Sequence, residues 1–154
     1  GRLFRIGGAT ARDVLRIPTR AGEALYYELV WTESYGDDRR TEACAILRYP
    51  LPGPLPLMRI KPEGVFGLAN NDLTTEWQEF NREFDVKTDD ERVGQAVLTK
   101  PVQEFLMDRL RGERLAFDGD GVFLWIDRYD VEDVDRCVKL MEELTALIPA
   151  AAYE

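Results

Sequence analysis

The chain has 154 residues, of which 45% are hydrophobic and 32% are charged. This length suits one domain with one core, and the composition is typical of a globular chain, not of a disordered or membrane-spanning one. The net charge of -9 makes nucleic acid and anionic lipid unexpected partners, because it repels phosphate groups.

The sequence contains no histidine, which removes the usual general base, the commonest metal ligand and every catalytic triad that needs imidazole. Cys44 and Cys137 match no spaced zinc or redox motif, so we expect small buried side chains, with a disulfide as the alternative. A reducing, cytoplasmic compartment is the expectation. Because the chain starts at Gly1 without methionine, it could be the soluble part of a longer, membrane-anchored protein.

The first predicted elements are two strands, residues 13–17 and 24–32, joined by a hairpin connection whose proline and glycine favour a turn. The second strand alternates with a period of two, which is typical of a half-buried strand. The side chains predicted to face the core are Leu25, Tyr27, Leu29 and Trp31.

The next segment is predicted as a turn at 33–40 followed by a third strand at 41–49. Residues 50–56 hold four prolines and should leave the sheet or follow its edge as a stiff connector, with a polyproline ligand as the less favoured alternative. A short strand resumes at 57–62, and residues 63–79 suggest a partly packed loop or a short helical turn.

A fifth strand is predicted at 80–87, with Phe80, Phe84 and Val86 on one face and Asp85 among the polar residues of the other. Thr88 stands three residues before Glu91, the spacing of a capping box, so a helix should begin there.

That helix is predicted to run to about residue 99, with Val93, Ala96 and Val97 repeating at helical spacing. Pro101 suits the first turn of a second helix, and Gly112 is a plausible stop after it. The buried stripe predicted for the second helix is Val102, Phe105, Leu106 and Leu110.

Residues 113–127 are predicted to form a tight hairpin, because the Asp-Gly dipeptides at 118–121 favour a short turn between apolar strands. Leu115 and Phe117 would then pair with the opposite arm of that hairpin. A final helix capped by Asp130 should cover the sheet. Its predicted apolar face is Val134, Cys137, Val138, Met141, Leu144 and Ile148.

Two acidic groups are candidate cation or catalytic sites. The segment at 118–121 resembles part of a calcium loop, but sheet residues follow it where ligands would be required, so a turn is the better interpretation. The second group is Asp127, Asp130, Glu132, Asp133 and Asp135. Acids in the first helical turn are stabilised by the helix dipole, which explains most of this group without a ligand. We therefore expect no catalytic residue, metal or cofactor.

Five aromatic residues could line a ligand cavity inside a curved sheet, although core packing is the default for aromatic residues on strands. They are Tyr26, Tyr27, Trp31, Trp77 and Trp125. The chain holds no P-loop, no GxGxxG and no GxSxG motif.

The segment from 79 to 126 resembles a family of uncharacterised bacterial domains, and the preceding residues 55–67 look like the actinobacterial branch of such proteins. The shared pattern is an FxxxFxV strand, an acidic turn, an AxLTxP helical segment and a short hairpin. The matching residues are Phe80, Phe84, Val86, Asp89, Ala96, Leu98, Thr99 and Pro101. The resemblance implies a domain of unknown function, in some members attached to a membrane segment, and supplies no catalytic residue.

Together these patterns predict a single α+β domain over 1–154, in which an antiparallel sheet of about six or seven strands packs against the last helix. A helical pair should precede the last hairpin. Strands followed by a closing helix would suit a PH-like barrel. The function expected is that of a noncatalytic binding or regulatory module with a protein partner. The alternatives are a small-ligand carrier with an aromatic pocket, and a carboxylate-dependent enzyme using acids between Asp118 and Asp135.

Overall fold

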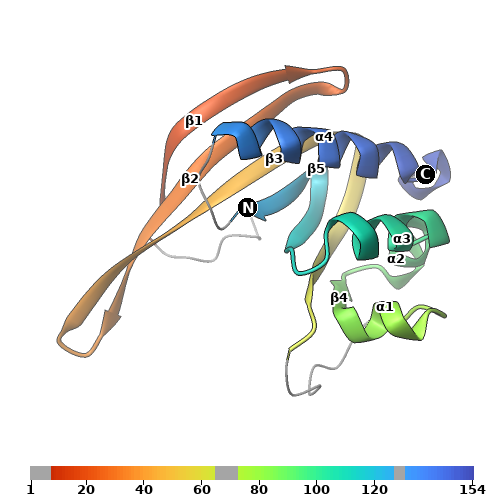
Figure 1. Cartoon of the computed structure of the whole chain (residues 1–154), viewed down its shortest axis with the longest axis horizontal. Helices are drawn as coiled ribbons and strands as arrows, with labels where there is room; N and C mark the ends of the chain where they lie inside the picture. The colour runs from red at the N-terminus through yellow and green to blue at the C-terminus, as the bar shows by residue number, and fades with distance from the viewer. Residues whose placement is uncertain (1–7, 65–72, 127–130) are drawn as a thin grey trace.

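The computed structural model describes residues 8–64, 73–126 and 131–154, without the side chains of residues 131 and 132. It is an α+β structure in which an open, curved antiparallel sheet is covered on one face by a C-terminal helix (Figure 1). The strands are β1 (Thr10–Thr19), β2 (Gly22–Tyr35), β3 (Asp38–Pro62), β4 (Phe84–Thr88) and β5 (Leu115–Ile126). The helices are α1 (Gln78–Glu83), α2 (Glu91–Val97), α3 (Lys100–Arg109) and α4 (Val131–Leu147), followed by the 3-10 helix η1 (Ala150–Tyr153).

The predicted fold class is confirmed, but the sheet has five strands instead of six or seven, and it is open where a PH-like barrel would be closed. The lower number arises because several predicted strands merge. β3 is the organising strand: it pairs with β2 through its first half, with β4 through its last residues, and with β5 along its other edge.

The proline-rich segment does not leave the sheet as predicted, because it is the middle of β3. Prolines lack an N–H, so they fit where a strand edge has no ladder bond to make. Pairing with β2 ends at Arg48 and pairing with β4 begins at Met58, so the prolines fall between the two ladders. On the β5 side, register shifts between Pro50 and Met58 accommodate the bend of the strand.

The predicted strand at 80–87 is wrong in its first half, where residues 78–83 form α1. Phe80 and Phe84 are both buried, and their ring centroids lie 5.1 Å apart across the helix-to-strand junction. Asp85, predicted on the strand face opposite Phe84, is 1% exposed, and its Oδ2 lies 3.6 Å from Lys61 Nζ. The period-two pattern therefore identified β4 but placed its start too early.

The helical pair is confirmed as α2 and α3, with Pro101 in the first turn of α3. The predicted capping box is not formed, because the N-cap of α2 is Asp90, whose carboxylate accepts a hydrogen bond from the Val93 N–H at 3.1 Å. The Thr88 hydroxyl accepts from the Asp90 N–H instead and shapes the turn before the helix. Gly112, with φ of 82°, follows the end of α3.

The predicted hairpin at 113–127 is a single bent strand, β5, and both of its arms pair with β3. Leu115 lies opposite Ile60 and Phe117 opposite Met58, instead of facing the other arm. The Asp-Gly segment still bends the chain, with Gly119 at φ of 59°. The ends of the arms approach closely enough for the Trp125 N–H to donate to the Arg114 carbonyl.

α4 covers the inner face of the sheet, as predicted, and all six residues of its predicted apolar face are buried. The predicted cap, Asp130, lies outside the described residues. The face assigned to β2 is wrong: Ala24 and Tyr26 enter the core, whereas Leu25, Tyr27, Leu29 and Trp31 point to the outer face, away from α4. Both faces of β2 carry apolar residues, so alternation alone could not choose between them.

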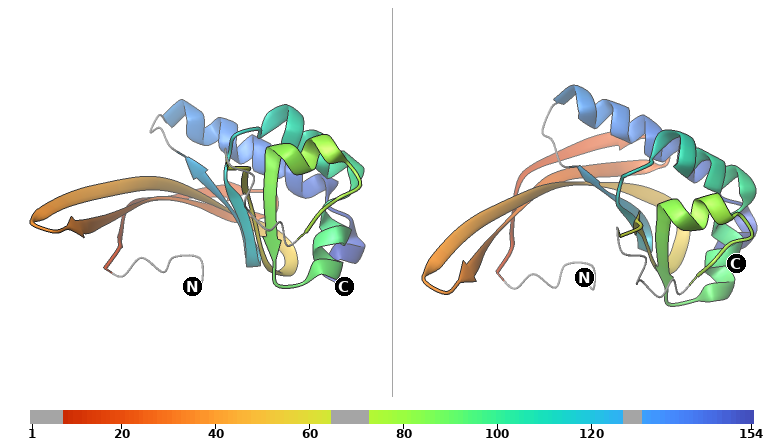
Figure 2. Two further views of the ribbon diagram at one scale, coloured as in Figure 1. Left: turned by 90° about the horizontal axis from the view of Figure 1, so that it is seen from below. Right: turned by 60° about the horizontal axis from the view of Figure 1, so that its bottom comes forward.

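Helices α2, α3 and α4 gather at one end of the sheet, and the β2–β3 hairpin extends away from the other end (Figure 2). Within the described part of the chain, no helix is both long and apolar enough to cross a membrane.

Candidate functional site: a projecting arm

The β2–β3 hairpin forms an arm, which we define as residues 31–42. β1 pairs with β2 only as far as Val30, and β5 reaches β3 only at Ala45, so residues 31–35 and 38–42 pair only with one another in the described structure. Five residue pairs at about 3.3 Å per residue make an arm of roughly 17 Å. Figures 1 and 2 show it extending from the body of the domain.

The arm ends in a two-residue turn, Gly36 and Asp37, flanked by the Tyr35–Asp38 pair. Gly36 has φ of 63°, which glycine adopts without steric cost and which suits the twist of a tight hairpin. The predicted turn over 33–40 is therefore confined to two residues, and strand continues on both sides of it.

One face of the arm carries a connected group of side chains around Glu33. The Trp31 indole N–H donates to Glu33 Oε1 at 3.1 Å, and the Tyr35 hydroxyl donates to Glu33 Oε2. The Arg40 guanidinium lies 5.9 Å from the centre of the Tyr35 ring. These hydrogen bonds, with that from Tyr35 the larger influence, lower the pKa of Glu33, and the carboxylate in turn raises the pKa of Tyr35.

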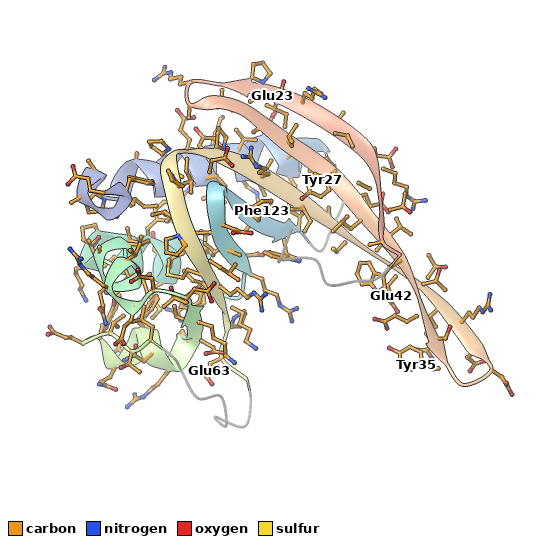
Figure 3. All side chains as sticks on the ribbon, turned by 180° about the vertical axis from the view of Figure 1, so that it is seen from behind. Glu23, Tyr27, Tyr35, Glu42, Glu63 and Phe123 are labelled. Carbon is orange, nitrogen blue, oxygen red and sulfur yellow. The ribbon has the colours of Figure 1, made fainter. Side chains whose placement is uncertain are left out.

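This face is aromatic but solvent-accessible at its tip, where Tyr35 is 60% exposed. Figure 3 shows Tyr35 and Glu42 on the arm, on the same side of the sheet as Tyr27 and Phe123. The opposite face of the arm holds Thr32, Ser34, Arg39 and Thr41. The arm offers aromatic groups and charges of both signs, which suits a contact surface better than chemistry on a bound substrate.

Towards the body, the outer face becomes apolar. Tyr27 on β2 lies opposite Ile46 on β3, which in turn lies opposite Trp125 on β5. Ile46 is fully buried, and burial raises the pKa of Tyr27. Two residues further along β3, on the same outer face, the Arg48 guanidinium lies 2.6 Å from Asp120 Oδ1.

The five aromatic residues singled out in the sequence do not converge on one cavity. Tyr26 is in the core, Tyr27 and Trp31 lie on the outer face of β2, and Trp125 lies on the outer face of β5. Trp77 precedes α1 and stacks near Phe80 with 6.4 Å between ring centroids.

Two separate cavities border members of this set. One, of about 490 Å³, is lined by Trp77, Leu98, Gln103 and neighbouring polar residues, and Lys100 Nζ lies 3.4 Å from the centre of the Trp77 ring. The other, of about 290 Å³, lies between α3, β5 and α4, beside Trp125 and Cys137. Both fall within or near the size range of small-ligand sites.

The candidate acids are divided between different elements. Asp118 and Asp120 lie on β5, and Asp133 and Asp135 lie on α4. Asp127, Asp130 and the side chain of Glu132 lie outside the described structure. Among the residues that the structure describes, no group of three or more acids or cysteines could hold a metal ion.

The cysteines lie on opposite faces of the sheet and are thiols instead of a disulfide. Cys44 is half-buried beside Leu29 on the outer face, and Cys137 is buried in the core on α4. Burial raises the pKa of the Cys137 thiol. Deprotonation of this thiol is therefore disfavoured in the folded state.

We expect a thiol reagent to modify Cys44 much faster than Cys137, because the thiolate is the reactive form and Cys137 is both buried and protonated. Because the pKa of Cys137 is higher in the folded state than in the unfolded state, its protonation contributes fully to stability at pH values below the unfolded thiol pKa of about 8.5. This contribution is lost as pH rises through the folded-state pKa. Mass spectrometry of labelled peptides from pH 7 to pH 9 measures both rates. Equal rates at the two thiols would contradict this assignment, and Cys44→Ser identifies the slower site.

Comparison with protein-family models, with curated proteins and with solved structures found no significant match to this chain. The resemblance drawn from the segment at 79–126 stays a prediction. The candidate site therefore depends on its geometry alone.

Proposed function

We propose that this chain is a noncatalytic protein-interaction module and that its contact element is the projecting arm. The observation that carries this proposal is a two-stranded ribbon, residues 31–42, that leaves the body and presents Tyr35, a residue that is 60% exposed. An isolated hairpin is only marginally stable in water, so a projecting one gains stability when another surface covers it. A partner surface supplies that cover.

The chemistry of the arm favours a protein as the partner. Tyrosine, tryptophan and arginine are the residues enriched at the energetic centres of protein interfaces, and the arm places Trp31, Tyr35 and Arg40 on one face. The internal hydrogen bonds of Glu33 hold two of these side chains in place before binding, which lowers the entropy cost of association. A cytoplasmic location suits the two thiols.

Photo-crosslinking tests this proposal. Tyr35 is replaced by p-benzoylphenylalanine, and Leu147, which is 37% exposed at the end of α4, receives the same replacement as the matched control. Irradiation of cells that produce each protein should give a discrete crosslinked protein from position 35 and not from position 147. If position 35 crosslinks no better than position 147, the arm is not a contact element.

The cavity beside Trp77 supports a second candidate function, a small-ligand carrier. Its lining combines an aromatic ring, the Lys100 ammonium group and the amide of Gln103, whose Nε2 donates to the Leu98 carbonyl at 2.6 Å. Such a mixture of apolar and convergent polar groups is typical of ligand sites. Native mass spectrometry should then show extra mass that is lost in Lys100→Ala, whereas a bare chain, or a clean multiple of its mass, favours the protein-interaction function.

A further inference from the structure

The edges of this sheet differ in how well they are protected from pairing with another strand. On β1, Asp13 has φ of 53° at a register shift between Arg12 and Leu15, and Pro18 lies near the other end. Bulges, prolines and charged side chains are among the devices by which proteins limit edge pairing. The edge of β4 is also covered, because the Leu73 N–H donates to the Val86 carbonyl.

The β3 edge of the arm has neither device. Its residues 38–43 contain no proline or glycine, and its ladder with β2 runs through eleven consecutive pairs from Leu25–Arg48 to Tyr35–Asp38. In the described structure, β5 stops at the pair Ala45–Ile126, so this edge has no partner strand beyond that point. It is a regular edge without a bulge or a proline, which can serve as a template for another strand, and its charged side chains restrict that strand to one of complementary charge.

The direction of its backbone groups follows from the turn. A two-residue hairpin turn is closed by a hydrogen-bonded pair, here Tyr35–Asp38, and hydrogen-bonded and non-hydrogen-bonded pairs then alternate. Asp38, Arg40 and Glu42 therefore direct their N–H and C=O groups to β2. Arg39, Thr41 and Ala43 direct theirs to the open edge.

We propose that the partner of the arm is a second copy of this chain, bound by antiparallel pairing of the two β3 edges around a two-fold axis at Thr41. The inference rests on the proposed function and names its partner. Thr41 would exchange two hydrogen bonds with Thr41 of the second copy. Arg39 would exchange two hydrogen bonds with Ala43 of the second copy, and Ala43 would exchange two with Arg39 of the second copy. The interface would then hold about six hydrogen bonds.

The charges on the arm favour this register over the two adjacent ones. Centred on Thr41, Arg40 lies directly opposite Glu42 of the second copy, and the two-fold axis repeats that pair. The pairs are non-hydrogen-bonded ones, in which opposing side chains are closest. A shift of the axis to residue 40 places Arg40 opposite Arg40, and a shift to residue 42 places Glu42 opposite Glu42. Both shifts set like charges against each other, which is destabilising.

The assembly also closes. A two-fold axis perpendicular to the ribbon keeps the aromatic faces of both arms on the same side, and the arms become one four-stranded sheet. Each arm is as long as the open edge that it covers, since that edge runs from the turn at Asp37 to the end of β5 at Ala45. The interface is isologous, so it stops at a dimer instead of growing into a fibre.

Analytical ultracentrifugation of two proline variants tests the assigned edge. Thr41→Pro removes an N–H that points to the open edge of β3. The matched control is Thr32→Pro, at the cross-strand partner of Thr41, which removes an N–H that points to the opposite edge, that of β2. Neither change removes a hydrogen bond between β2 and β3. We expect a wild-type dimer whose Kd rises by more than about tenfold in Thr41→Pro and changes little in Thr32→Pro. A wild-type monomer at millimolar concentration, or the reverse sensitivity, would overturn the proposal.

Charge reversal tests the register without a change to the backbone. Arg40→Glu alone and Glu42→Arg alone each place like charges opposite one another, so each variant should dimerise about tenfold more weakly. An equimolar mixture of the two restores opposite charges in both pairs, so a heterodimer should form. If the mixture associates no better than its components, the register is wrong.

The crosslinking experiment separates the two levels of inference. A product of twice the chain mass from position 35 supports both the protein-interaction function and the second copy. A product that contains a different protein keeps the function and overturns the second copy. No product from position 35 overturns the function itself.

Discussion

Phe84→Ala is expected to lower the free energy of unfolding by about 3–5 kcal/mol, as for other fully buried phenylalanines. Phe84 is 1% exposed at the junction of α1 and β4, and its ring stacks on that of Phe80 at 5.1 Å between centroids. Removal of the ring leaves a cavity between the helix and the sheet, because the closely packed neighbouring side chains cannot move far enough to fill it. Urea denaturation followed by circular dichroism measures the change.

Phe105→Ala is the matched control, because Phe105 is only partly buried on α3, with the Arg109 guanidinium 5.7 Å from its ring centre. The same change of side chain should cost clearly less there. A double-mutant cycle with Phe80→Ala should give a coupling energy of about 0.5–1.5 kcal/mol for the stacked pair. A Phe84→Ala loss below about 1 kcal/mol would show that this junction is not part of the core.

The elements that the sequence predicted well are those fixed by local signals. Pro101 marks the first turn of α3, and the apolar spacing of α4 from Val134 to Ile148 recurs as its buried face. Helical periodicity and caps act over a few residues, so they can be recognised without knowledge of the partner surface. The β1–β2 hairpin belongs to the same class.

The errors concern segments whose state depends on distant partners. Phe80 and Phe84 are four residues apart, a spacing that fits a helix turn as well as alternate positions of a strand, and short apolar runs do not distinguish the two. The bend at 118–121 joins two arms of β5. Both arms pair with the long strand β3 instead of pairing with one another as a hairpin. The prolines at 50–56 stay in β3 because their edge falls between the β2 and β4 ladders.

The arm was hidden for a different reason. Residues 33–40 are polar except for Tyr35 and Gly36, so composition favours a turn, and only Gly36–Asp37 carried the signal of a two-residue hairpin. The residues that we propose for the contact surface share a face only once the register is known: Arg40 lies opposite Glu33, and its guanidinium lies 5.9 Å from the centre of the Tyr35 ring. The predicted absence of catalytic residues, metal and cofactor remains a prediction.

Leu144→Ala should cost about 2–5 kcal/mol, whereas Leu147→Ala on the same helix should change stability by no more than about 0.5 kcal/mol. Leu144 is fully buried against the inner face of the sheet, and Leu147 is 37% exposed at the end of α4. Both changes alter helix propensity in the same direction, so the difference between them measures burial.

α4 covers the inner face of the sheet next to β3. Loss of its packing therefore destabilises the part of the sheet from which the arm extends. Leu144→Ala should therefore lower the denaturation midpoint without a change of slope, since the same surface is exposed on unfolding. A wild-type midpoint in Leu144→Ala, or a loss in Leu147→Ala of the same size, would mean that α4 presents a different face to the sheet. The arm would then lack the rigid base that its proposed pairing requires.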